Sequence, residues 1–189
     1  MKEEYTLVFD GDFYKSLGVA GGTYLLIDNR EGQRYTSHTV MPEITSPHHA
    51  SYRTLLTALQ ALLAVMESRG ETPESLSLEI RGDNQLVIKQ LSGEWRTKAA
   101  HLRMLHHQVR HILERFRSYT LLWQNHKESE AFLGPLSPAS YQDMVEASTL
   151  RREKPEKVQL PGLGFTLTDG EERDEERESD YILIFDGGK

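Results

Sequence analysis

Cysteine is absent from the 189 residues of this chain. That absence excludes disulfide bonds, thiol nucleophiles and thiolate metal ligands together. It is compatible with a reducing compartment, and we expect a cytoplasmic location. Long apolar runs are also missing, because none approaches the roughly 18 residues that a membrane span requires. The acidic start MKEEYTLVFD does not resemble a signal peptide, so we expect no contact with a membrane.

The chain also lacks an excess of positive charge. The formal net charge is −7, which argues against broad electrostatic attraction to nucleic acid. The excess is uneven, since residues 151–189 carry 7 Lys and Arg against 11 Asp and Glu, whereas residues 1–150 carry 15 against 18. The first 150 residues are therefore close to balance and have room for a local basic face.

Periodic apolar patterns place the secondary structure. β-rich runs bounded by turn residues predict five strands, at residues 5–12, 22–28, 33–40, 75–83 and 118–125. Apolar residues at three- and four-residue steps predict helices at residues 46–70, 84–93 and 98–117. The order β-β-β-α-β-α-α-β predicts an α/β fold with a mixed five-stranded sheet flanked by helices.

The character of the chain changes near residue 134. Length alone allows one domain with a tail, or two very small domains. We expect one domain at 1–134, followed by an extra helix and the start of a linker at 135–158. Residues 159–180 contain Pro, Gly and many acidic residues, which predicts a linker. Residues 181–189 return to a strand pattern, so the expected C-terminal extension ends in an extra strand.

This last segment is a near-copy of the first strand. YILIFDGGK at 181–189 and YTLVFDGDF at 5–13 share five of nine residues, and Asp186 falls where Asp10 stands. One interpretation is a tandem protein in which a second copy of the domain begins here. The other is a structural strand that pairs with a sheet edge of this chain or of another copy, because an unpaired apolar strand is prone to association.

Two carboxylates follow neighbouring predicted strands. Asp10 comes after YTLVF, and Asp83 comes after SLEIRG. Carboxylates at the ends of adjacent strands can bind a hard cation such as Mg²⁺. An Asp beside Gly after a strand is more often only a turn, so the meaning of this pair depends on its context.

That context resembles the ribonuclease H type 1 family over roughly residues 5–134. FDGDFYKSLGVAGG is similar to the family's first strand and Gly-rich turn, and SYRTLLTAL to the start of its first helix. The most specific likeness is GDNQLVIKQLSGEW, with Asp83, Gly93 and Trp95 in the family's positions. HLRMLHHQVRHILERF and SYTLLW follow at the expected spacing. The resemblance implies the ribonuclease H-like fold.

The resemblance also implies four carboxylates that hold two Mg²⁺ or Mn²⁺ ions and hydrolyse the RNA strand of an RNA/DNA hybrid. Asp10 and Asp83 are retained. Ser51 stands where the first helix should supply a metal-binding Glu, and Phe132 or Leu133, depending on a one-residue gap, replaces the fourth carboxylate. We therefore expect one weakly held ion or none, and hydrolysis that is very slow or lost.

Other side chains near the gaps are alternative metal ligands. Asp12 shares a strand face with Asp10, and Glu128 and Glu130 lie near the missing fourth ligand, as does His126. A separate pair, His107 and His111, has the spacing of two ligands on a helix. No catalytic Glu lies between these two, and we expect a solvated helix face.

A basic stretch surrounds an aromatic residue after the short helix. In the family this region meets the DNA strand, which implies phosphate contacts from Lys89, Arg96 and Lys98 and stacking on Trp95. A Trp packed on its own sheet is an equal alternative. The resemblance implies nucleic-acid contacts for five further residues: Lys15 and Gly18 of the KSLG turn, which replaces the family's Gly-Asn-Pro-Gly, His48 and His49 before the first helix, and Asn84. For His48 and His49, a role at the entry of the helix is at least an equal alternative.

Three functions remain open at this point. The first is binding of RNA/DNA hybrid or structured RNA, with metal-dependent hydrolysis weak or lost. The second is a protein-interaction or scaffold domain that kept the fold, which the acidity and the altered KSLG turn favour. The third is an active nuclease with a rebuilt site. The retained GDNQLVIKQLSGEW motif favours the first.

Overall fold

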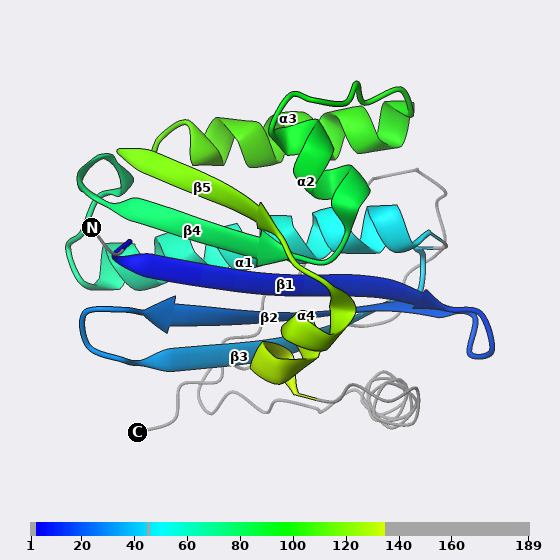
Figure 1. Cartoon of the computed structure of the whole chain (residues 1–189), viewed down its shortest axis with the longest axis horizontal. Helices are drawn as coiled ribbons and strands as arrows, with labels where there is room; N and C mark the ends of the chain where they lie inside the picture. Colours follow the sequence, from blue (N-terminus) through cyan, green and yellow to red (C-terminus); the bar gives the residue numbers. More distant parts are fainter. Residues whose placement is uncertain (1–2, 45, 135–189) are drawn as a thin grey trace, which may run out of the picture. The chain divides into compact units, whose positions relative to one another are not determined.

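A computed structural model of the chain describes residues 3–44 and 46–134 (Figure 1). The helix and linker expected at 135–158 and 159–180 lie outside the described residues. So does the strand at 181–189 that repeats the first strand. In the part that the structure describes, no helix is long and apolar enough to span a membrane.

Five strands form one mixed sheet. They are β1 (Tyr5–Tyr14), β2 (Val19–Asp28), β3 (Arg34–Met41), β4 (Ser77–Gly82) and β5 (Ser118–Trp123). The order across the sheet is β3-β2-β1-β4-β5. Pairing is antiparallel from β1 to β2 to β3 and parallel from β1 to β4 to β5. The predicted mixed five-stranded sheet is confirmed, and β1 is its central strand.

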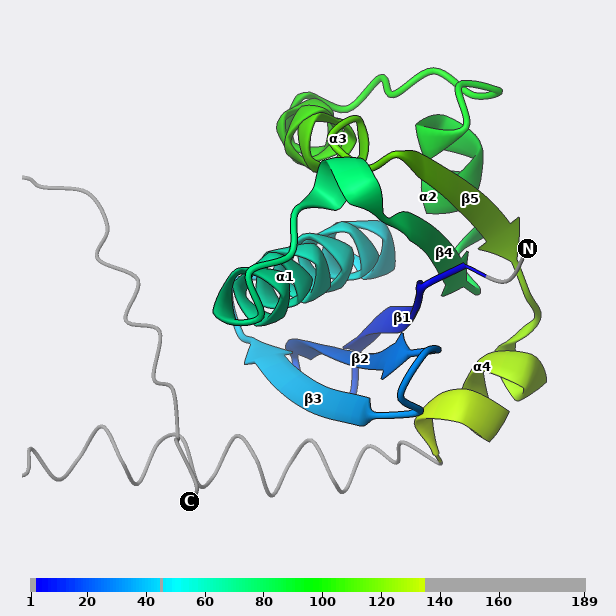
Figure 2. The same cartoon turned by 90° about the vertical axis from the view of Figure 1, so that its left-hand side faces the viewer.

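Helices cover both faces of this sheet. They are α1 (Pro47–Ser68), α2 (Gln85–Leu91), α3 (Ala100–Leu113) and α4 (His126–Leu133), with a 3-10 turn at Pro73–Ser75. α1 and α3 lie on one face and α4 on the other, as the two views show (Figure 1, Figure 2). α2 packs beside β5. The sequence therefore predicted three of the four helices.

The main hydrophobic core lies between the sheet and α1, which covers one of its faces. α1 has Pro47 in its first turn, where the missing N–H costs nothing, and ends before Gly70, whose φ of 68° suits a helix stop. Along its apolar face, Leu55 and Leu59 are fully buried in one cluster with residues of β1. Burying each such side chain stabilises the fold by about 1.5–3 kcal/mol, so α1 holds the central strand in place.

α4 is the element that the apolar pattern did not predict. It begins at a capping box, in which the Asn125 side chain accepts from the backbone N–H of Glu128 (3.1 Å) and the Glu128 carboxylate accepts from the backbone N–H of Asn125 (3.2 Å). At its other end, Leu133 packs against Val8 and Leu25 on the second face of the sheet. Eight residues are too few for a clear helical period, so the signal for α4 was the cap.

Gly11 sets the closest approach between β1 and α1. A Cβ atom at this position would lie 2.5 Å from both the carbonyl carbon of Ala50 and the nitrogen of Ser51, which are backbone atoms that move only with the helix. Replacing Gly11 by alanine should therefore lower the free energy of unfolding by about 2–3 kcal/mol, measured by urea denaturation. At Gly18, where φ is 66° and no atom lies within 4 Å of an added Cβ, the same change should cost about 1 kcal/mol. Equal losses at the two glycines would contradict the close approach.

Candidate active site

The parallel register of β1 and β4 brings two carboxylates together. The last paired residues are Phe9 and Gly82, so Asp10 and Asp83 follow side by side at the same edge. Asp10 lies on the central strand, and Asp83 lies just after β4. The Trp123 indole N–H donates to the backbone oxygen of Asp83 (2.9 Å), which holds this loop. The two retained residues of the resemblance are therefore neighbours in space.

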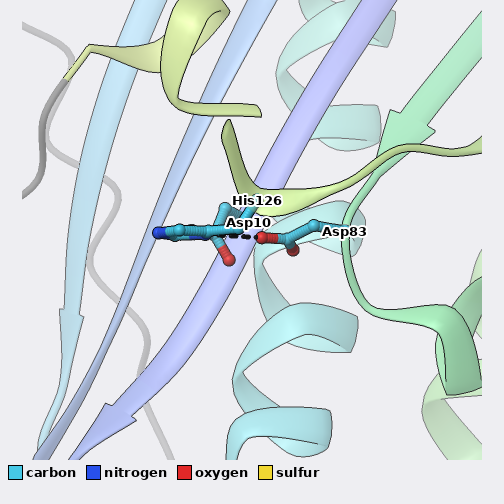
Figure 3. A group of neighbouring side chains, drawn as sticks. All are labelled: Asp10, Asp83 and His126. Atoms are coloured by element: carbon cyan, nitrogen blue, oxygen red, sulfur yellow. Dashed lines mark hydrogen bonds and ion pairs between the residues drawn. The ribbon is translucent and has the colours of Figure 1, made fainter. Parts of the chain in front are cut away.

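His126 is the third member of the site. It is the first residue of α4, and its Nδ1 lies 3.0 Å from Asp83 Oδ2 (Figure 3). One ligand atom from each of Asp10, Asp83 and His126 lies within 4.8 Å of the others. The sequence placed His126 only near the missing fourth ligand. The packing of α4 across β1 makes it a direct neighbour of the carboxylates.

Burial and crowding change the protonation of this group. Burial, followed by the negative charge of Asp83, raises the pKa of Asp10 from 3.8 to about 7. The hydrogen bond to Asp83 raises the pKa of His126. In the metal-free protein Asp10 and His126 therefore keep their protons to higher pH than isolated side chains would. Perturbed carboxylates in a cleft are typical of functional sites.

Ser51 occupies the place of the expected metal-binding Glu. It is fully buried, and its hydroxyl lies 2.8 Å from the backbone oxygens of both Gly11 and Pro47. The Asn84 amide donates to the same hydroxyl oxygen (2.8 Å). Its hydrogen-bonding capacity is thus used within the protein, and it offers no anionic oxygen to a cation.

The fourth expected carboxylate is replaced by an apolar side chain. Leu133, which is buried, lines a small pocket of about 110 Å³ together with Asp10, Asp12 and Glu130. Phe132 packs on the second face of the sheet, where the Arg81 guanidinium lies 5.7 Å from its ring centre. Of these two residues, Leu133 is the one that lines a pocket together with Asp10.

The three alternative carboxylate ligands differ in their availability. Glu128 closes the capping box of α4 and is engaged there. Asp12 and Glu130 are exposed at the small pocket, next to His126. The residues present do not fit a pair of Mg²⁺ ions, because two dications need more negative charge than Asp10 and Asp83 provide. They fit a single cation.

A wider pocket opens in front of the three side chains. It has a volume of about 530 Å³, and Trp95, His48 and Asn84 contribute to its lining along with Asp10 and Asp83. Trp95 is 47% exposed, so about half of its surface is accessible. Asn84 is the N-cap of α2, and His48 lies 3.2 Å from its side-chain oxygen.

The other expected nucleic-acid residues lie outside the pocket lining. Lys15 and Gly18 form the exposed turn between β1 and β2. The His49 ring contacts that of His101 of α3 in a tilted arrangement, with ring centres 5.3 Å apart. A final set lies after or within α2: Lys89, which pairs with Glu94 (Nζ–Oε2 2.6 Å), and the exposed Arg96 and Lys98.

A mixed sheet ordered β3-β2-β1-β4-β5, with one carboxylate on its central strand and another directly after the parallel neighbour, is the arrangement of a ribonuclease H-like protein. The profile of the reverse transcriptase-like family matches residues 8–131. The chain therefore belongs to this ribonuclease H-like family. Among curated proteins, none matches the chain.

Solved ribonuclease H structures share the fold. The N-terminal RNase H domain of rv2228c from Mycobacterium tuberculosis, studied as a fusion with maltose binding protein, superposes with a TM-score of 0.63 at 18% identity, over 78% of this chain and 99% of that one. RNase H1 from the halophilic archaeon Halobacterium salinarum NRC-1 gives 0.56 at 26% identity, over 67% and 89%. LC11-RNase H1 in complex with RNA/DNA hybrid gives 0.55 at 19% identity, over 66% and 88%.

Proposed function

We propose that this protein binds RNA/DNA hybrid or structured RNA at the pocket in front of Asp10, and hydrolyses RNA slowly or not at all. The observation that carries the proposal is the pair Asp10 and Asp83 at an open pocket whose lining includes the half-exposed Trp95. A similar structure, LC11-RNase H1, is in complex with RNA/DNA hybrid. Exposed Trp side chains offer stacking surfaces to nucleic acid.

Basic residues near Trp95 support the same role. Arg96 and Lys98 are exposed, whereas Lys89 forms its ion pair with Glu94. Arg96 directly follows the Trp, so a phosphate contact and a stacking contact would lie close together in one nucleic acid. The overall charge of −7 then limits binding to this local surface and makes it sensitive to salt.

Slow or absent hydrolysis follows from the lost carboxylates. Ser51 is engaged with Gly11 and Asn84, and Leu133 is buried against the sheet. The family chemistry uses one metal ion to activate water and a second to stabilise the leaving oxygen. A site that fits one cation lacks one of these two functions.

The double variant Arg96→Ala/Lys98→Ala should weaken binding of a labelled RNA/DNA hybrid and reduce the salt dependence of its binding constant by about one to two phosphate contacts. Fluorescence anisotropy at 20 to 200 mM NaCl measures both quantities. The matched control, Arg34→Ala/Arg115→Ala, removes two exposed charges on β3 and after α3 and should leave binding unchanged. Equal weakening by both pairs would contradict a local binding surface.

The same hybrid, incubated with Mg²⁺ or Mn²⁺, measures hydrolysis. We expect bound but largely uncut RNA, and any slow cleavage should disappear in Asp10→Asn. Rapid cleavage that Asp10→Asn abolishes would contradict the loss of activity and support a rebuilt site. Absence of salt-sensitive binding to hybrid and to structured RNA would support the alternative, a protein-interaction or scaffold domain.

Besides the acidity and the altered KSLG turn, a further observation favours that alternative. The hydroxyl of Ser51 and the amide of Asn84 are hydrogen-bonded to the protein, as in a structural core rather than a reactive cleft. We further propose that any Mg²⁺ or Mn²⁺ is weakly held. We also propose that the protein acts in the cytoplasm. For residues 181–189 we propose either the start of a second copy of the domain or pairing with another strand.

A further inference from the structure

Three separate elements supply the donors of one compact cluster. Asp10 comes from β1, Asp83 from the end of β4 and His126 from the start of α4. One donor atom from each lies within 4.8 Å of the other two (Figure 3). Bonds of about 2.0–2.2 Å in a tetrahedral site place two ligands of the same ion roughly 3.4 Å apart, which is closer than this limit. Small side-chain rotations would bring all three donors onto one ion.

The kind of donor decides which ion fits. Mg²⁺ requires near-octahedral oxygen ligands and keeps several waters. An imidazole nitrogen suits Zn²⁺ and other transition metals, and two carboxylates with one histidine form a mixed nitrogen and oxygen set. Three protein ligands with one open position are the usual arrangement of a reactive zinc site.

We propose that Asp10, Asp83 and His126 bind a single divalent transition-metal ion, with Zn²⁺ strongly preferred over Mg²⁺. Two carboxylates balance the charge of one such ion. Ser51 and Leu133, at the positions of the missing carboxylates, add no ligand for a second. The inference concerns the metal alone and does not depend on nucleic-acid binding.

The surroundings leave room for an ion and its remaining ligand. The pocket of about 530 Å³ opens onto all three side chains, and among the described residues its lining contains no Lys or Arg that would already neutralise the carboxylates. Asp12 and Glu130 face the cluster from the adjoining small pocket. Carboxylates beside a metal site can accept hydrogen bonds from a metal-bound water.

Contacts outside the cluster also hold its residues in position. The Trp123 indole N–H fixes the backbone oxygen of Asp83 (2.9 Å), and the capping box of Asn125 and Glu128 fixes the start of α4 where His126 stands. Neither contact uses a donor atom of the proposed ligands. The site is thus preorganised in the metal-free protein, which lowers the cost of ordering it.

Calorimetric titration of the metal-free protein tests the proposal without nucleic acid. We expect one Zn²⁺ per chain, bound at least about 100-fold more tightly than Mg²⁺. In His126→Ala the Zn²⁺ affinity should fall by about 100-fold or more, whereas Mg²⁺ binding should change little. His126 has a side chain that is 75% exposed, so the variant should fold, and circular dichroism checks this. Bound Co²⁺ provides a second readout through its visible spectrum.

A matched control separates this site from surface histidines. His107→Ala/His111→Ala removes the helical pair on α3, which has its own two-ligand spacing, and should leave the tight Zn²⁺ site intact. Loss of Zn²⁺ binding in that control but not in His126→Ala would overturn the proposal. So would two ions per chain, or Mg²⁺ bound as tightly as Zn²⁺.

Discussion

Replacing Asp10 by asparagine is expected to raise the free energy of unfolding of the metal-free protein at pH 8 by about 2–4 kcal/mol. Burial and the charge of Asp83 raise the pKa of Asp10 from 3.8 to about 7. Between these two values the folded protein keeps a proton that the unfolded chain has lost. Asp10 therefore reduces stability progressively as pH rises through this window, and its full cost is present above pH 7. Asparagine carries no charge and escapes this cost.

Urea unfolding at pH 5 and pH 8 in the presence of a chelator measures the effect. The difference between Asp10→Asn and the original protein should be less than half as large at pH 5 as at pH 8. Asp12 is the matched control, since it is exposed on the same strand and Asp12→Asn should change stability by less than about 0.5 kcal/mol. A loss of stability in Asp10→Asn at pH 8 would show that the carboxylate is a structural partner.

The ion pair between Asp83 and His126 also makes the stability of the protein fall as pH rises. Its hydrogen bond raises the pKa of His126, so the stability that it contributes is present at low pH and is lost as pH rises through that pKa. The comparison of Asp10→Asn with the original protein largely cancels this term. The two carboxylates Asp10 and Asp83, held close together at a cost to stability, are typical of a site that serves a ligand.

The second large expected effect on the free energy of unfolding concerns Asp28, at the opposite end of the sheet. Replacing Asp28 by alanine is expected to lower the free energy of unfolding by about 3–5 kcal/mol. The Asp28 side chain is fully buried, and its Oδ2 accepts from Arg30 Nη2 (2.8 Å) and from Arg69 Nη1 (2.5 Å). Alanine leaves both guanidinium groups without this partner. Hydrogen bonds from Arg30 hold the pKa of Asp28 well below its usual range, so the stabilisation is lost as pH falls below about 4.

Denaturant unfolding at pH 7 measures this loss. Glu114→Ala is the control, because it removes the exposed pair of Arg110 and Glu114 on α3 (2.7 Å) and should cost less than about 0.5 kcal/mol. Asp28→Asn should lie between the two variants. Equal losses in Asp28→Ala and Glu114→Ala would contradict the role of burial.

The two predictions also separate stability from function. Asp28 pairs with Tyr5, whereas Asp10 lies five residues further along β1 and pairs with Thr23. This is a distance of about 16 Å at the rise of a strand. Asp28→Ala should therefore leave metal binding unchanged at temperatures where the protein is folded, while Asp10→Asn should abolish it without loss of stability.

Local sequence patterns suffice to predict the strands and the long helices. Strands and long helices have apolar periods that are local properties of the chain, and all five strands and the helices α1, α2 and α3 were predicted. α4 was missed because eight residues carry little periodicity, although the capping pattern of Asn125 and Glu128 was present. An exposed Trp95 could not be told from a packed one without the fold.

By itself, the sequence determined the family resemblance, the order of the elements, the retained Asp10 and Asp83 and the replacement of a carboxylate by Ser51. These follow from residue types and their spacing along the chain. Only the tertiary structure placed His126 at 3.0 Å from Asp83, 43 residues away, and put Leu133 rather than Phe132 in a pocket with Asp10. The physical reason is that both contacts depend on how α4 packs across β1, and the raised pKa of Asp10 depends in turn on the burial and register that this packing creates.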